Sequence, residues 1–127
     1  MRDERQVFLM SLTEELRTLG VDVDGALKRL GGNAALYERL LGTFPKTLQE
    51  HYVSPDFDGS DYKETTEMAH AIKGTSGNLS ITPVYEAYTE IVNLLRAGRP
   101  EEARAILKEI LPVQENILAC IERYKQQ

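Results

Sequence analysis

The sequence is poor in the residues that build disulfide-rich proteins and thiolate metal sites. Its 127 residues include one cysteine, Cys120, and no tryptophan, and aromatic residues make up only 7% of the chain. A single cysteine excludes an intramolecular disulfide framework and any zinc site built on paired thiolates. It fits a reducing, cytoplasmic setting, in which we expect Cys120 to be a buried apolar residue rather than a reactive thiol.

The sequence also lacks an excess of positive charge and any long apolar run. Fifteen Lys and Arg residues stand against twenty Asp and Glu, a formal net charge of -5. This balance disfavours a general nucleic-acid binder, because binding to phosphates needs clustered cations. Charged residues interrupt every apolar stretch, so we expect no membrane span and no signal peptide. From Met1 at the first position we expect a free-standing protein, and the sequence leaves open the alternative of a module cut from a larger hybrid kinase.

The residues that are present predict one all-α domain over residues 1–127. The chain is 42% hydrophobic and 28% charged, which suits a globular protein with a single core. Apolar residues recur at steps of three and four nearly everywhere, and no segment alternates convincingly with period two. We therefore predict an antiparallel four-helix bundle over residues 33–125, preceded by a helical cap over residues 1–32 with one or two short helices.

The cap is expected to hold two helices. One runs from Glu4 to Leu19, and a shorter one, capped by Asp22 or Asp24, runs through Leu30 and is broken by Gly31 and Gly32. The N-terminal helix could be part of a docking surface, a dimer element or a cover for the bundle, and the sequence leaves these alternatives open.

The four bundle helices are expected over Asn33 to about Tyr52, Asp61 to Leu79, Thr82 to Gly98 and from Pro100 onward. Asn33 is the expected N-cap of the first of these. Because an interior proline removes a backbone hydrogen bond, Pro45 predicts a kink near Leu41 to Phe44 rather than a break, and Pro112 predicts a bend in the last helix. Ser60 or a nearby Asp is the expected start of the second.

The second bundle helix carries a histidine on its polar side. At about 100° per residue, the positions within about 60° of His70 are Lys63, Thr66, Glu67, Lys73, Gly74 and Gly77. The opposite stripe consists of Thr65, Met68, Ile72, Ser76 and Leu79. His70 is therefore expected to point away from the core.

This polar side has the features of a phosphoryl-accepting site. Gly74 and Gly77 leave the helix surface bare, at a cost of about 0.5 to 1 kcal/mol each relative to alanine, so another surface can approach His70 closely. Lys73 can reach an anion near the ring, whose neutral nitrogen is nucleophilic. Glu67, one turn earlier, could orient the ring by accepting a hydrogen bond from it.

The run from Ala69 to Leu79, AHAIKGTSGNL, closely resembles the signature of histidine-containing phosphotransfer (HPt) domains. In that family, a histidine is followed after two residues by Lys-Gly, then by small residues and an asparagine. The resemblance extends to the stretch from Val21 to Asn33 and covers about residues 21–122. Ser80 departs from the family, which often has glycine there, and Ile91-Val92-Asn93 replaces a commonly acid-rich segment.

The resemblance implies a phosphorelay intermediate without kinase activity of its own. His70 would accept a phosphoryl group from the aspartate of one receiver domain and pass it to another, in response regulators or hybrid sensor kinases. Lys73 and Gly74 match the residues that flank the phosphate, and Gly77 and Asn78 match the small residue and the asparagine that follow. The receiver is expected to supply Mg²⁺, and we expect this chain to bind no metal or other cofactor. We also expect a monomer, although the sequence does not decide the oligomeric state.

Two other functions would use the same face of the helix. A metal site on Glu67 and His70 is disfavoured, because only two ligands converge and Lys73 would repel a cation. A helical adaptor could use the same face to bind a partner without accepting phosphate. His51, between Glu50 and Tyr52, has no such company and is read as an ordinary surface histidine.

Overall fold

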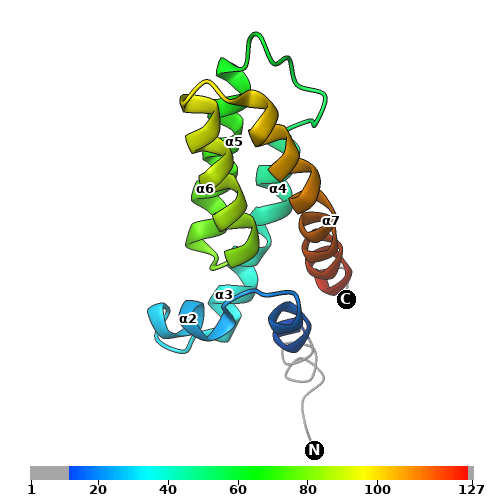
Figure 1. The fold of residues 1–127 in the computed structure, drawn as a ribbon. Coiled ribbons are helices and arrows are strands. Elements are labelled where there is room, and N and C mark those ends of the chain that lie inside the picture. The colour runs from blue at the N-terminus through cyan, green and yellow to red at the C-terminus, as the bar shows by residue number, and fades with distance from the viewer. Residues whose placement is uncertain (1–11, 126–127) are drawn as a thin grey trace, which may run out of the picture.

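The computed structural model describes residues 12–125, and their regular secondary structure is entirely helical (Figure 1). The helices are α2 (Val23–Arg29), α3 (Ala34–Leu41), α4 (Thr43–Glu50), α5 (Lys63–Asn78), α6 (Thr82–Arg96) and α7 (Pro100–Lys125), and residues 12–18 form a further helical segment. The predicted all-α class is confirmed. The part of the expected N-terminal helix before residue 12 lies outside the described residues.

Helices α4, α5, α6 and α7 pack in a closed ring, in which each helix contacts two neighbours. Helix α5 packs against α4 and α6, and α7 packs against the same two helices. Figure 1 shows α4 and α6 running in one direction, and α5 and α7 in the other, while α3 leads into α4 from the lower end. Helix α2 contacts α3 at this lower end, outside the ring.

Buried side chains from every helix of the ring meet in one core. The largest fully buried ones include Phe44, Ile72, Tyr88, Leu107 and Ile117. Burying each such side chain contributes about 1.5 to 3 kcal/mol relative to leaving it exposed.

The polar groups that enter the core are paired. The Tyr88 hydroxyl donates to Oε1 of the buried Gln114 at 2.7 Å, and the Tyr37 hydroxyl donates to the Leu79 carbonyl at 2.9 Å. Burial raises the pKa of Tyr37 to about 12 and that of Cys120 to about 11. Cys120 is buried as predicted, and its raised pKa keeps it a protonated thiol at neutral pH.

The caps of the two short helices near the N-terminus follow the sequence. The Asp22 side chain accepts a hydrogen bond from the Gly25 amide, and the Asn33 side chain accepts one from Leu36, both at 3.0 Å. Gly31 and Gly32 both have positive φ angles, which a glycine pair adopts without steric cost. These residues end α2 and begin α3 where the sequence predicts.

The first bundle helix differs from its prediction. It is divided at Gly42 into α3 and α4, rather than kinked as one helix, and it ends at Glu50. Gly42 keeps right-handed helical angles, so the division is slight. It falls one turn before Pro45, which has no N–H to donate to the Leu41 carbonyl.

The starts of α5 and α6 also differ from expectation. Tyr62, not Ser60 or an aspartate, is the N-cap of α5 and makes no side-chain capping bond. Ser60 instead donates its amide and hydroxyl to Asp58, at 2.8 and 2.7 Å, and stabilises the preceding loop. The sequence predicts Thr82 as the N-cap of the next helix, whereas the N-cap of α6 is Ile81 and Thr82 is its first helical residue.

Candidate functional site

His70 lies in the middle of α5 with its side chain exposed, whereas residues on the opposite face of the helix are buried. Ala69, Ile72 and Ser76 have no exposed surface, and Leu79 is 3% exposed. The Ser76 hydroxyl donates to the Ile72 carbonyl at 2.7 Å, so this polar group is satisfied within the helix. The helical periodicity thus places His70 outside the core, as predicted.

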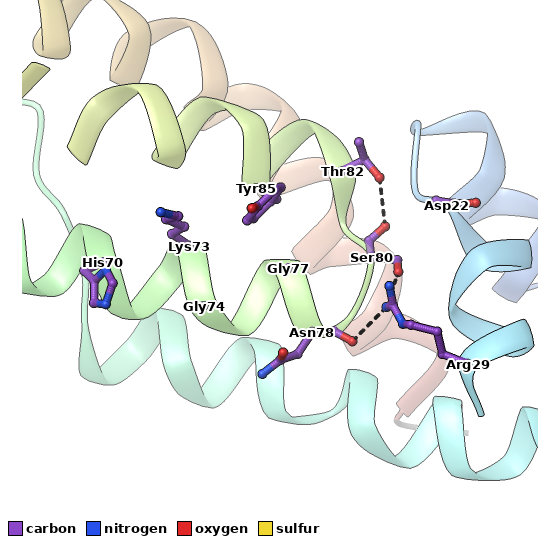
Figure 2. A pocket seen from close by; sticks show the side chains of 10 residues that line it. All are labelled: Asp22, Arg29, His70, Lys73, Gly74, Gly77, Asn78, Ser80, Thr82 and Tyr85. Atoms are coloured by element: carbon purple, nitrogen blue, oxygen red, sulfur yellow. Dashed lines mark hydrogen bonds between the residues drawn. The ribbon is translucent and has the colours of Figure 1, made fainter. Parts of the chain in front are cut away.

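The imidazole lies at one end of an open groove of about 480 Å³, here called the His70 groove. Its lining residues are His70, Lys73, Gly74, Gly77 and Asn78 of α5, Ser80 of the following turn, Thr82 and Tyr85 of α6, and Asp22 and Arg29 at the two ends of α2. Figure 2 shows His70 and Lys73 on successive turns of α5, with Arg29 approaching the far end of that helix.

The groove carries two cationic side chains in a chain of net negative charge. Lys73 is half-buried and forms no ion pair with any residue between 12 and 125. Arg29 donates from Nη2 to the Ser80 hydroxyl at 2.5 Å and to the Asn78 carbonyl at 3.3 Å. Asp22 is the only acidic residue in the lining. The groove therefore attracts anions.

The C-terminal end of α5 is held in a left-handed turn at Ser80. Its φ angle is +58°, and hydrogen bonds from Ser80 to Gly77 and from Ile81 to Ser76 complete the pattern of a Schellman cap. Glycine is the usual residue at this position because a side chain is strained there.

Two contacts from the N-terminal region hold the strained serine. Arg29 binds its hydroxyl, and the Asp22 amide donates to its carbonyl at 2.9 Å. Ser80 stands where the HPt pattern often has glycine, and the contacts from Asp22 and Arg29 hold it in the left-handed conformation. The end of α5 therefore has the backbone geometry that a glycine would give.

The two glycines on the histidine face have different surroundings. A Cβ atom added at Gly74 would have no other atom within 4 Å, so this stretch of α5 is open to an approaching surface. A Cβ atom at Gly77 would lie 3.0 Å from Cδ2 of Tyr85. Gly77 therefore admits the Tyr85 ring from α6, which is close packing within the chain rather than open access.

Glu67 does not line the His70 groove. It lies with Tyr62, Lys63 and Arg96 at a separate hollow near the start of α5. No hydrogen bond joins Glu67 to His70 in the described part of the chain, so the geometry offers no support for a role in orienting the ring. His51, at the C-cap of α4 beside Glu50, also lies outside the groove.

Sequence reasoning missed the groove residues that come from other helices. Arg29 and Asp22 lie about fifty positions before α5 ends, and Tyr85 lies on the next helix. The one local signal was Ser80, because a non-glycine residue at a left-handed cap needs compensating contacts. Among residues 12–125, no cluster of three or more His, Cys, Asp or Glu side chains could hold a metal ion.

Comparison with known proteins agrees with this geometry. The family model described as Hpt domain matches residues 4–127. No curated protein and no solved structure gives a significant match to the chain. Within the described residues, no helix is both long and apolar enough to cross a membrane. The chain belongs to the Hpt domain family, whose members are phosphocarriers rather than kinases, and it therefore takes part in two-component phosphotransfer.

Proposed function

We propose that this chain is a phosphorelay intermediate that carries a phosphoryl group on His70 between the aspartates of two receiver domains. The observation that carries the proposal is the combination of an exposed imidazole, a Lys73 side chain with no ion pair among residues 12–125, and the bare backbone at Gly74, all on one side of α5. Each of these features has a use when a phosphoryl group arrives from outside.

In the transfer step, the lone pair of one neutral imidazole nitrogen attacks the phosphorus of the aspartyl phosphate. A P–N bond forms as the P–O bond to the aspartyl carboxyl breaks, and the bonding electrons leave with the carboxylate. The other ring nitrogen keeps its proton, so the charge balances without a proton acceptor. Transfer to a second receiver is the reverse reaction, with the second carboxylate attacking the phosphorus.

The groove residues would position the phosphoryl group and balance its charge. Lys73, three residues after His70, would neutralise phosphate oxygens, while Gly74 would let the partner backbone come close. We propose that Gly77 and Asn78 contribute only to the shape of the groove. Mg²⁺ would be held by the receiver and would neutralise phosphoryl oxygens during transfer, with no metal on this chain.

The partners would be receiver domains of response regulators or hybrid sensor kinases, bound by a monomer of this chain in the cytoplasm. Two surfaces must come together so that the aspartyl phosphate and the imidazole are in line. The exposure of the histidine in mid-helix supports this arrangement, because a partner can reach it without any change in the bundle.

The test is a transfer assay with two receivers. A phosphorylated donor receiver and Mg²⁺ are mixed with the chain, and an unphosphorylated acceptor receiver is added afterwards. Label is expected first on this chain, stable to base and labile to acid, and then on the acceptor. The sequence has two histidines, so His51→Gln is the matched control for His70→Gln.

The result expected is full relay with His51→Gln and none with His70→Gln. Receiver binding without label on the folded wild type, across several receivers, would overturn the proposal and leave a helical adaptor. Label that persists in His70→Gln would overturn the assignment of the site.

A further inference from the structure

Tyr85 is one of two large hydrophobic side chains that the described part of the molecule leaves exposed. Its residue surface is 39% exposed, on the first turns of α6, and it lines the His70 groove. The other is Tyr52, which is 52% exposed and lines a different hollow, between α4 and α7. Only Tyr85 therefore lies beside the histidine.

The Tyr85 ring is seated directly on α5. A Cβ atom at Gly77 would come within 3.0 and 3.1 Å of its Cδ2 and Cε2 atoms, so the ring occupies the space that a side chain would fill. In Figure 2 the ring lies over Gly77, between Lys73 and Thr82. Because one edge is fixed against the helix, the exposed part of the ring can be covered by a partner at little cost in side-chain entropy.

Charged groups lie on both sides of this ring. Lys73 lies toward the middle of α5, and Arg29 lies toward its end. An apolar platform between cations fits a partner surface that offers an aliphatic side chain with carboxylates around it. A receiver domain that carries its phosphoryl group on an aspartate must present such acidic chemistry to this groove.

We propose that Tyr85 is the docking residue by which the His70 groove selects among receiver domains, through an aliphatic partner side chain packed on its ring. This inference rests on the proposed function, since the partner is a receiver. Tyr85 acts on binding of the partner and not on the transfer of the phosphoryl group. It is therefore a specificity-determining residue, and the chemistry stays with His70 and Lys73.

Tyr52 provides the matched control. Its hollow mixes Lys46 and Lys125 with three acidic residues, Glu50, Glu115 and Glu122, and contains no histidine. Tyr52→Ala removes the same kind of side chain from a comparably exposed position. A general effect of losing a surface tyrosine would appear in both variants, whereas an effect on docking would appear in Tyr85→Ala alone.

The experiment measures KM and kcat for transfer from a phosphorylated receiver to wild type, Tyr85→Ala, Tyr85→Phe and Tyr52→Ala. Tyr85→Ala is expected to raise KM by about 30-fold or more, the effect of an interface hot spot, with little change in kcat. Tyr85→Phe keeps the ring and is expected to behave as wild type, as is Tyr52→Ala. Labelling of His70 by phosphoramidate, a small phosphodonor that needs no docking, is expected to be the same in all four.

Three outcomes of the KM measurements would overturn the proposal. KM could stay unchanged in Tyr85→Ala, rise equally in Tyr52→Ala, or rise in Tyr85→Phe. A matching loss of labelling by phosphoramidate would make Tyr85 a residue that positions the site instead of docking the partner. If the wild type takes no label from receivers, the proposed function and the role of Tyr85 fall together, whereas normal labelling with unchanged KM overturns only Tyr85.

Discussion

The two faces of α5 differ in burial and in hydrogen bonding. On the buried face, Ile72 has no exposed surface and the Ser76 hydroxyl is bonded to a backbone carbonyl. On the other face, the side chains of His70 and Lys73 form no hydrogen bond or ion pair with any residue from 12 to 125. One helix thus combines a face whose groups are all satisfied internally with a face whose groups are left for a partner.

Elsewhere on the described surface, four arginines form ion pairs with carboxylates. The ion pairs are Arg17–Asp24, Arg99–Glu102, Arg104–Glu101 and Arg123–Glu15. Arg104 also lies over the Phe57 ring, 4.2 Å from its centroid, and so holds the loop before α5 against α7. The difference teaches that stability and chemistry are separated across α5, and mutations on the two faces should have separable effects.

The largest change in stability is expected on the buried face. Ile72→Ala leaves a cavity in the core and should lower the free energy of unfolding by about 2 to 5 kcal/mol. His70→Gln, two residues earlier on the exposed face, should stay within about 0.5 kcal/mol of wild type. Urea denaturation followed by circular dichroism measures both, and similar losses in the two variants would contradict the separation of the faces.

Loss of the Lys73 side chain should slow phosphoryl transfer without changing the stability of the bundle. Lys73→Ala removes a charged contact to the phosphoryl group worth about 1.5 to 3 kcal/mol, equivalent to a decrease of about 10- to 150-fold in transfer rate. Lys63→Ala, at an exposed position on the same helix, is the control and should transfer at the wild-type rate. Equal rates for Lys73→Ala and wild type, in rapid-quench assays, would remove Lys73 from the mechanism.

A smaller effect is expected where α2 meets the end of α5. Arg29→Ala removes the bond to the Ser80 hydroxyl and should cost about 0.5 to 1.5 kcal/mol of stability. Adding Ser80→Gly relieves the left-handed strain and should recover much of this loss, because glycine adopts a positive φ freely. Thermal unfolding of the single and double variants checks this, and no recovery would mean that Arg29 does not compensate for Ser80.

A change in stability of the opposite sign is expected at Gly74. Because a Cβ atom there meets nothing, Gly74→Ala should stabilise the helix by about 0.5 to 1 kcal/mol. The same methyl group should slow transfer by standing in the way of the receiver. Gly77→Ala is the comparison and should not gain stability, since its Cβ atom meets the Tyr85 ring. A Gly74→Ala variant with faster or unchanged transfer would show that the bare backbone has no role in access.

Much of this separation could be predicted from the sequence. Helical periodicity alone placed His70 opposite Ile72, because the two faces of a helix follow from its constant angle per residue. The caps at Asp22 and Asn33 could be predicted because they depend on a side chain and an amide three residues later. Ser60 is not the N-cap of α5, because its amide and hydroxyl both donate hydrogen bonds to Asp58 in the preceding loop.

The rest of the groove depended on contacts between distant segments. Arg29 reaches Ser80 across about fifty residues, and no local pattern predicts that meeting. The angular position of Gly77 on the helix does not predict its role. A glycine is needed there because the Tyr85 ring from α6 occupies the space that a side chain would fill. Helical periodicity therefore predicts the direction in which each side chain points. The residue that packs against it from another helix is known only from the three-dimensional structure.

The measurement that tests the central claim most directly is the location of the phosphoryl group. The wild-type chain is phosphorylated by a receiver, digested without acid, and its peptides are examined by mass spectrometry with fragmentation. We predict one phosphoryl group per chain, on His70, with His51 unmodified. Phosphate on His51 or on a carboxylate, or none on a folded chain that binds the receiver, would contradict the assignment of the exposed face of α5 to phosphotransfer.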